Sequence, residues 1–253
     1  MSQKDIPPNA IRIVFDSGLA KLVRGGCREV SYPLKRRASI KDIVESLGVP
    51  HTEIGEFRTG DLRPGWEHIP AGGEDLQARS ITPPFDVTRP CPLRPNPLPD
   101  LRFICDVNVG KLAVLLRMIG ADAWMENEWD DACIAAAAQK FGRVVLSKDS
   151  GLLKRKQIEF GRLVRSEDPD RQLREVVDFF GLRPDRFFSR CLRCNTRLVP
   201  VEKSRIEHRL LPKTRKYFHE FFLCPACGRI YWSGSHMDKM RDRLRAIGLT
   251  PPF

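Results

Sequence analysis

The sequence lacks any apolar run that approaches the roughly 20 residues needed to cross a bilayer. Its first residues, Met1 to Asn9, are polar and contain proline, so they also lack the apolar segment of a secretory signal. These absences argue against a membrane protein and predict a location in the cytoplasm. In that reducing compartment, the eight cysteines indicate metal binding rather than a framework of disulfides.

Excess positive charge is missing from the first part of the chain and concentrated in the second. Residues 1–142 contain 18 Lys and Arg against 19 Asp and Glu, whereas residues 143–253 contain 25 against 13. A basic excess of this size attracts polyanions, and nucleic acid is the commonest of them. The alternative is that an arginine-rich surface only keeps the protein soluble.

The first 82 residues predict a small α+β domain. Ile11–Phe15 alternates as a strand does, Leu19–Val23 can return as its hairpin partner, and a last strand is expected near Leu76–Ile81. Between these strands, Ser39 is the predicted N-cap of a helix that ends at Gly48. The order of elements resembles the ubiquitin-like β-grasp fold.

This domain lacks the features that would make it a modifier or an enzyme. Sulfur carriers of the β-grasp type use a free carboxyl-terminal Gly-Gly, whereas Gly72-Gly73 lies before the predicted last strand. The domain also has no clustered acid, His or Cys. We therefore predict an interaction module that binds a protein partner. Seven prolines in residues 83–99 then exclude a helix and favour a semi-rigid linker, with a proline-rich ligand segment as the alternative.

Strand and helix patterns alternate in the second domain. The predicted strands are Leu101–Asp106, Ala121–Met125, Val144–Asp149 and Arg162–Val164, and the predicted helices are Gly110–Gly120, Asp130–Gly142 and one that begins at Asp168-Pro169. Such alternation predicts a parallel sheet with helices on both faces. The carboxyl ends of its strands then meet at one edge, where ligands bind in open α/β sheets.

Acidic residues gather at this predicted edge. Asp106 and Asp149 end two strands, and the pair Asp130-Asp131 begins a helix. Converging carboxylates repel one another unless a cation neutralises them, and oxygen ligands without histidine favour Mg²⁺ or Mn²⁺. An ion of this kind supports phosphodiester hydrolysis. The alternative is that these residues only cap helices.

Two Cys-x-x-Cys turns predict a zinc module near the end of the chain. The four thiolates are those of Cys191, Cys194, Cys224 and Cys227. They form a closed set without an open position, so the zinc is predicted to be structural. Between the turns, Lys213, Arg215 and Lys216 accompany several aromatic residues. These residues can hold RNA phosphates and bases, or the aromatics can form the core of the module while the charges are solvated. The tail His236–Ile247 predicts an amphipathic helix that covers the module.

Five short motifs lie between residues 106 and 153. They are Asp106, Gly110-Lys111-Leu112-Ala113, Leu116-Arg117-Met118-Ile119-Gly120, Asp130-Asp131, and the stretch from Val144 to Leu153. Together they resemble the ribonuclease family named after the carboxyl-terminal domain of the Mut-seven exonucleases. The resemblance implies a PIN-like nuclease domain followed by a zinc ribbon, and some bacterial members of the family carry an amino-terminal ubiquitin-like domain.

The resemblance also implies roles for individual residues. Asp106 and Asp149 correspond to the first and third metal-binding acids, and Asp130 or Asp131 to the helical acid between them. Lys111 and Arg117 become candidates for contacts to RNA phosphate. Lys148 is a further candidate, with a role in shaping its turn as the alternative. In this sequence, the acidic residues that follow the second predicted strand of the domain are Glu126 and Glu128.

The sequence thus predicts an α/β protein with four parts. They are a ubiquitin-like β-grasp domain (residues 1–82), a Pro-rich linker (83–100), a PIN-like parallel-sheet α/β/α nuclease domain (101–188), and a zinc ribbon with a C-terminal helix (189–253). The predicted function is a Mg²⁺- or Mn²⁺-dependent ribonuclease whose partner is RNA, with tRNA and other structured RNAs among the candidates. The alternative is a non-catalytic RNA-binding or adaptor protein with a degenerate PIN-like domain.

Overall fold

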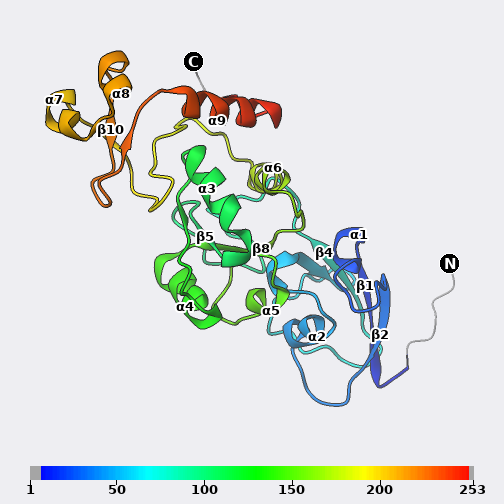
Figure 1. Ribbon diagram of the computed structural model, residues 1–253. Coiled ribbons are helices and arrows are strands. Elements are labelled where there is room, and N and C mark those ends of the chain that lie inside the picture. Colours follow the sequence, from blue (N-terminus) through cyan, green and yellow to red (C-terminus); the bar gives the residue numbers. More distant parts are fainter. Residues whose placement is uncertain (1–6, 251–253) are drawn as a thin grey trace.

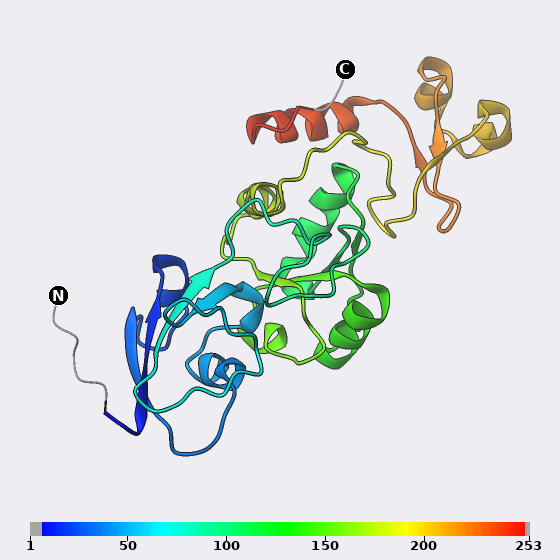
Figure 2. The same cartoon turned by 180° about the vertical axis from the view of Figure 1, so that it is seen from behind.

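The computed structural model describes residues 7–250. Residues 1–6 and 251–253, the outer ends of the predicted first and last domains, lie outside the described residues. Three sheets follow one another along the chain: a mixed sheet, a parallel sheet and a small antiparallel sheet (Figures 1 and 2). This arrangement confirms the predicted α/β class. Among residues 7–250, no helix is both long enough and apolar enough to span a bilayer.

The mixed sheet is that of a ubiquitin-like domain. Its strands are β1 (Ala10–Phe15), β2 (Glu29–Pro33), β3 (Ile54–Arg58) and β4 (Asp75–Ser80), in the order β2-β1-β4-β3. The central pair, β1 and β4, is parallel, and the outer pairs are antiparallel. Helix α2 (Ile40–Ser46) packs its apolar side chains on the sheet. It begins where the sequence predicts, because the Ser39 hydroxyl accepts the N–H of Asp42 at 3.2 Å.

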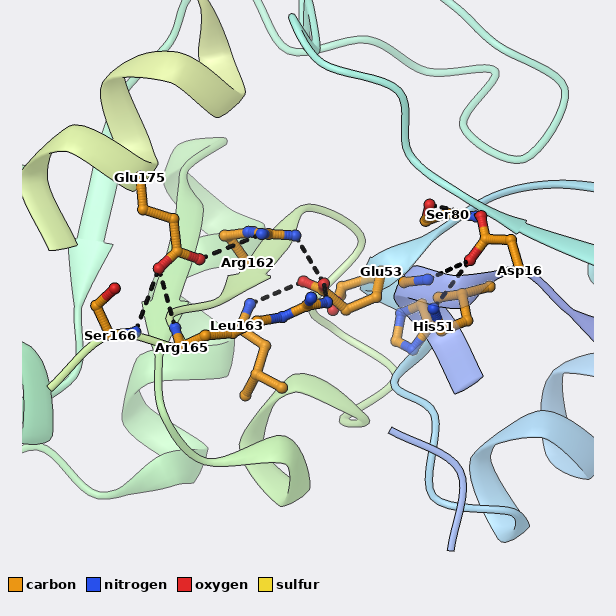
Figure 3. Close-up of polar contacts among 12 residues, drawn as sticks. Asp16, His51, Glu53, Ser80, Arg162, Leu163, Arg165, Ser166 and Glu175 are labelled. Carbon is orange, nitrogen blue, oxygen red and sulfur yellow. Dashed lines mark hydrogen bonds and ion pairs between the residues drawn. The ribbon is translucent and has the colours of Figure 1, made fainter. Parts of the chain in front are cut away.

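The segment after β1 differs from its prediction. Leu19–Val23 does not return as a strand, because the carboxylate of Asp16 accepts two backbone N–H groups at 3.0 and 2.9 Å and starts helix α1 (Ser17–Ala20). The antiparallel partner of β1 is β2 instead. Asp16 also accepts hydrogen bonds from the backbone and the hydroxyl of Ser80 on β4, both at 2.6 Å (Figure 3). Asp16 thus starts α1 through neighbouring N–H groups and also joins this turn to β4 across 64 residues.

The second sheet is parallel throughout. Its strands are β5 (Phe103–Cys105), β6 (Ala123–Trp124), β7 (Val144–Ser147) and β8 (Gly161–Leu163), in the order β6-β5-β7-β8. Its helices are α3 (Gly110–Met118), α4 (Asp131–Phe141), α5 (Ser150–Leu153) and α6 (Pro169–Phe180). Helices α3 and α6 share one core with Phe103 of β5, whereas α4 and α5 share another with Ile104. Neighbouring residues of β5 thus face opposite cores, and the predicted α/β/α layering is confirmed.

The third sheet belongs to the module that carries the four cysteines. Its strands are β9 (Val199–Pro200), β10 (Phe222–Leu223) and β11 (Ile230–Tyr231), and helices α7 (Lys203–Ile206) and α8 (Pro212–Tyr217) lie between β9 and β10. Helix α9 (Ser235–Ala246) does not cover this module. Figure 1 shows α9 beside α6. Leu244 of α9 is fully buried in the core of α3 and α6, and Arg243 of α9 pairs with Asp170 of α6 at 2.7 Å.

The proline-rich segment between the first two sheets is packed against both of them. Val87 lies in the core beside α3 and α6, and Leu93 lies in the core of the ubiquitin-like domain; each is 1% exposed. Arg94 is also buried, and its guanidinium donates to four backbone carbonyl oxygens at 2.9 to 3.2 Å. Three of these carbonyls belong to residues 51–54 and the fourth to Glu159. The segment is therefore not a solvated spacer.

Glu53 forms a second connection between the two sheets. It is 2% exposed and lies directly before β3. Its carboxylate accepts hydrogen bonds from Arg162 at 2.7 Å and Arg165 at 3.1 Å, and also from the backbone N–H of Leu163 at 2.8 Å (Figure 3). Glu175 of α6 holds the guanidinium of Arg162 from its other side at 3.2 Å. The edge strands β3 and β8 are thereby joined.

Glu53→Ala is expected to lower the free energy of unfolding by about 3 kcal/mol, because it leaves a largely buried Arg162 without one of its two carboxylates. Glu56→Ala is the matched control on β3. Its ion pairs with Arg58 and Arg79 are more exposed, so the loss should stay below about 1 kcal/mol. Denaturant unfolding of both variants measures the difference, and equal losses would contradict a special role for Glu53.

Candidate functional site

Two of the predicted metal-binding acids lie at the carboxyl edge of the parallel sheet. Asp106 directly follows β5, and Asp149 comes two residues after β7. Strands β5 and β7 are neighbours, with Cys105 beside Leu146, so both acids reach the same edge. Asp106 is buried, at 7% exposure, whereas Asp149 is exposed. The edge thus carries one enclosed and one accessible carboxylate.

A hydrogen-bond network fixes this pair of acids. The hydroxyl of Ser147 and the amide nitrogen of Asn108 both donate to Oδ2 of Asp106 at 2.6 Å. Oγ of Ser147 in turn accepts the backbone N–H of Asp149 at 2.8 Å. Oδ1 of Asn108 accepts the N–H of Lys148 at 3.1 Å. The end of β5 and the turn after β7 are therefore held as one unit.

Each carboxylate of the pair keeps one oxygen without a partner among the described residues. On Asp106 both hydrogen bonds reach Oδ2, which leaves Oδ1. On Asp149, Oδ1 accepts the N–H of Gly151 at 2.6 Å as the N-cap of α5, which leaves Oδ2. Hard divalent cations bind proteins through one or two carboxylates and several waters. This donor set therefore fits Mg²⁺ or Mn²⁺.

Asp130 and Asp131, at the start of α4, lie at the same edge but do not complete a set of metal ligands with Asp106 and Asp149. Asp130 is the N-cap of α4 and accepts the N–H of Cys133 at 2.8 Å, a bond that lowers the pKa of Asp130. Asp131 pairs with Arg155 at 3.6 Å. Within residues 7–250, no three carboxylates come close enough together to form a metal-ligand group. Asp130 and Asp131 therefore contribute negative charge around the pair formed by Asp106 and Asp149.

The predicted phosphate contacts near this edge differ in availability. An open pocket is lined by residues 107–111, Glu167, Pro169 and Gln172. Lys111 lines this pocket, is exposed, and its ammonium forms no hydrogen bond or ion pair with the described residues. Lys148 forms an ion pair with the exposed Glu167. Such exposed pairs contribute little to stability, so both lysines can respond to an incoming anion.

Arg117 is not available to RNA, contrary to its prediction. It is 2% exposed, and its Nε donates to the carbonyl oxygen of Ala123 at 2.8 Å. Its Nη1 donates to the carbonyls of Leu192 and Arg193 at 3.0 and 2.8 Å, inside the first Cys-x-x-Cys turn. Burial is the largest influence that lowers the pKa of Arg117. The residue docks the cysteine module on α3.

Asp122 holds the same turn from a second direction. Its carboxylate accepts from Asn195 at 2.8 Å and Arg143 at 2.6 Å, and it pairs with Arg190 at 3.2 Å. Burial opposes ionisation, but these bonds and charges lower the pKa of Asp122. Asn195 also accepts the N–H of Ala123 at 3.1 Å. The first cysteine turn is thus fixed to the start of β6.

The four predicted zinc ligands come together. They are Cys191, Cys194, Cys224 and Cys227, whose Sγ atoms all lie within 4.8 Å of one another. Two Sγ–Sγ distances are 3.4 and 3.6 Å. They approach the roughly 3.8 Å edge of a tetrahedron with Zn–S bonds of about 2.3 Å. Burial of the Cys191 thiol opposes its ionisation. The hydroxyl of Tyr231, which lies 3.1 Å from the sulfur, and nearby backbone N–H groups outweigh this effect and lower the pKa of Cys191 to about 6. The set therefore fits a structural zinc ion.

The basic residues predicted to hold RNA lie on α8, at the tip of the cysteine module (Figure 1). They are Lys213, Arg215 and Lys216, and all three are exposed. The aromatic residues around them were predicted either to stack on RNA bases or to form the core of the module, and the structure shows both environments. Phe221 is buried in the module, whereas Tyr217 and Phe222 are 64% and 42% exposed. Tyr217 and Phe222 are thus accessible to a base, while Phe221 supports the fold.

Sequence reasoning assigned no role to Asn108 and left that of Ser147 open. Both side chains contact Asp106. Asn108 lies two residues after Asp106, a spacing at which a short polar side chain can reach back to the strand end, and this signal could have identified it. Ser147 reaches Asp106 across 41 residues because β5 and β7 are neighbours, and its position in the sequence does not indicate that contact.

Comparison with protein families gives two matches. Residues 101–244 match the family described as Mut7-C RNAse domain, and residues 10–86 match the one described as Mut7-C ubiquitin. The first match covers more than half of the chain. No curated protein and no solved structure gives a match.

Proposed function

The chain belongs to the Mut7-C RNase domain family, and from this membership we propose that it is a metal-dependent ribonuclease that hydrolyses RNA phosphodiester bonds. Asp106 and Asp149 hold the catalytic Mg²⁺ or Mn²⁺, and Asp130 and Asp131 add negative charge beside them. The observation that carries the proposal is the free oxygen on each acid of the fixed pair at one sheet edge.

The chemistry divides between the ion and the side chains. A bound Mg²⁺ or Mn²⁺ lowers the pKa of a water and neutralises charge on the scissile phosphate. Ser147 and Asn108 occupy Oδ2 of Asp106 and so reserve Oδ1 for the ion. The N–H of Gly151 does the same for Asp149. Lys111 offers a positive charge to a phosphate oxygen of the bound strand.

The cysteine module holds the RNA, and its zinc is structural. Lys213, Arg215 and Lys216 bind phosphates, and Tyr217 stacks on an unpaired base. Arg117 and Asp122 tie the first cysteine turn to the parallel sheet, so α8 and the acidic edge belong to one frame. RNAs that extend over both surfaces, such as structured RNAs, are the favoured substrates.

Labelled single-stranded RNA, structured RNA and matching DNA, incubated with the zinc-loaded protein, test this proposal. Cleavage of RNA is expected with Mn²⁺ or Mg²⁺ and not with Zn²⁺ as the only metal. Asp149→Asn should lose the cleavage while its unfolding transition stays close to that of the wild type. Full cleavage by a purified Asp149→Asn protein would rule the proposed site out.

The N-cap roles of Asp130 and Asp149 favour a second candidate function. In a non-catalytic RNA-binding or adaptor protein, these acids would only start helices. That function predicts RNA binding without metal-dependent cleavage. It also predicts that Asp106→Asn leaves the affinity for Mn²⁺ unchanged, which calorimetry measures.

A further inference from the structure

A cavity of about 240 Å³ lies between the end of β6 and the first cysteine turn. Its lining combines two tryptophans and a methionine with polar side chains, and the lining residues are Arg117, Trp124, Met125, Glu126, Trp129, Cys194 and Asn195. Pockets that enclose a whole small molecule usually have roughly 300–1,000 Å³. The size of this cavity therefore suits one flat group of a larger ligand.

The cavity lies beside the strand end that carries Asp106. Trp124 is the last residue of β6 and lies opposite Ile104 of β5, two residues before Asp106. Neighbouring strands are about 4.8 Å apart. Met125 then lies against the start of α3, because a Cβ on Gly110 would come 2.8 Å from the sulfur of Met125. An RNA strand bound at Asp106 therefore has a neighbouring nucleotide within reach of the cavity.

A tight turn brings a carboxylate and an aromatic ring to the cavity. The N–H of Trp129 donates to the carbonyl oxygen of Glu126 at 3.4 Å and closes the turn of residues 126–129. Trp129 is half-buried, and its one ring contact among residues 7–250 is an edge contact with Trp124, with 6.5 Å between the ring centres. No described ring lies parallel to Trp129. Because Trp129 also lines the cavity, its ring is available to stack on a ligand.

The remaining walls are fixed by contacts within the protein. The guanidinium of Arg143 lies 3.7 Å from the ring centre of Trp124, and Phe141 forms an edge contact with the same ring at 5.1 Å between centres. Arg117 and Asn195 are 2% and 4% exposed, and both form hydrogen bonds that dock the cysteine module. A ligand that enters the cavity therefore has few side chains to order, which favours its binding.

The charges of the lining distinguish between the parts of a nucleotide. Glu126 is exposed, and its carboxylate forms no hydrogen bond or ion pair with residues 7–250. The cation of the lining, Arg117, already donates to three backbone carbonyl oxygens. A carboxylate repels a phosphate but accepts N–H groups from the edge of a base. The lining therefore fits a base better than a phosphate.

Guanine matches this carboxylate better than the other standard bases. Its Watson–Crick edge carries two neighbouring donors, N1–H and the N2 amino group, whereas adenine, cytosine and uracil each have one donor on that edge. An ionised carboxylate is an acceptor with two oxygens. Only guanine can thus occupy both oxygens of Glu126 at once.

We propose that this cavity binds an unpaired guanine of the RNA, with Trp129 stacked on the base and Glu126 accepting its N1–H and N2–H groups. The inference rests on the proposed ribonuclease function and adds a base preference to it. The guanine belongs to a nucleotide close to the bond that is cut, because the cavity adjoins the strand end of Asp106. Since Glu126 uses the Watson–Crick edge, guanines in loops and single strands are bound and paired guanines are not.

Binding of short RNAs to the full chain tests the base preference. The zinc-loaded Asp149→Asn protein leaves RNA intact, and fluorescence anisotropy gives Kd for labelled uridine oligonucleotides with one guanine, inosine, adenine or cytosine. The guanine RNA should bind about tenfold more tightly than the adenine or cytosine RNA. Inosine lacks the N2 amino group and should bind more weakly than guanine. In Glu126→Gln most of the guanine preference should disappear, because an amide has one acceptor oxygen.

Glu128→Gln is the matched control. Glu128 is exposed in the same turn but does not line the cavity. Both variants remove one negative charge, so any general rise in RNA affinity is common to them, and only Glu126→Gln should lose the preference. Trp129→Ala should raise Kd about tenfold for every RNA, and Trp129→Phe should raise it less because a ring remains.

A guanine preference that persists in Glu126→Gln would overturn the inference, and so would equal affinity of the parent protein for all four RNAs. Cleavage by the wild type is measured separately with Mn²⁺. Cleavage without a base preference in binding would reject the role of the cavity and keep the ribonuclease. A guanine preference without cleavage would support the cavity and reject the ribonuclease.

Discussion

Asp106→Asn is expected to lower the rate of manganese-dependent RNA cleavage by at least about a hundredfold. The amide cannot supply the negative charge that holds the ion, and a bound metal contributes several kcal/mol to the transition state, where each 1.36 kcal/mol is tenfold in rate. Its oxygen can still accept from Ser147 and Asn108, so the hydrogen-bonded frame should persist. Single-turnover cleavage with excess protein measures the loss.

Asp185→Asn is the control for this change. Asp185 has a side chain that is 81% exposed, and its one ion pair, with Arg186, spans 3.8 Å. The rate of RNA cleavage by Asp185→Asn should equal that of the wild type. Part of the activity of Asp106→Asn should return at high Mn²⁺ concentration, because the variant weakens metal binding rather than the fold. A wild-type rate in Asp106→Asn would contradict the assignment of this acid.

Cys224→Ser is expected to unfold the cysteine module. Structural zinc sites contribute about 10–16 kcal/mol of apparent binding free energy that the small module has few other means to replace. Cys224 is fully buried, and the sheet around it has strands of two residues each. Hydrogen exchange should increase over residues 191–231, and RNA affinity should fall with it. A chelator should reproduce both effects in the wild type.

The nuclease core should survive the loss of zinc. Helix α9 packs on α3 and α6 through Leu244, so it does not depend on the cysteine module. Exchange over β5 and β7 should therefore stay slow in Cys224→Ser. Cys27→Ser, which changes an exposed cysteine of the first domain, should alter neither region. Retained protection over residues 191–231 after metal removal would show that the module folds without zinc.

The features that the sequence predicts well are those that neighbouring residues decide. The Asp168-Pro169 pair starts α6 as expected, because Asp168 accepts the N–H of Arg171 at 2.9 Å. The buried runs before Asp106 and Asp149 place both acids at one edge, since parallel strands share their direction. The spacing of the four cysteines likewise brings their sulfurs together.

The features that the sequence does not predict depend on distant partners. An apolar stripe identifies the buried face of α9 but not the surface that covers it, and the core of α3 and α6 is that surface. Arg117 lies on a predicted helix, yet only the carbonyls of residues 192 and 193 show why it is buried. Asp16 caps α1 through neighbouring N–H groups, but its second carboxylate oxygen is held by Ser80, 64 residues away. Periodicity carries no information about such partners.

Arg94 makes the two family segments one cooperative folding unit. It lies in the gap between residues 86 and 101, where neither family match extends, and it joins carbonyls of the first domain to one of the second. A chain cut at residue 101 would lose Val87 from the nuclease core and separate the carbonyl of Glu159 from the guanidinium of Arg94. The two segments can be told apart in sequence, but neither completes its own interior, so a shared unfolding transition follows.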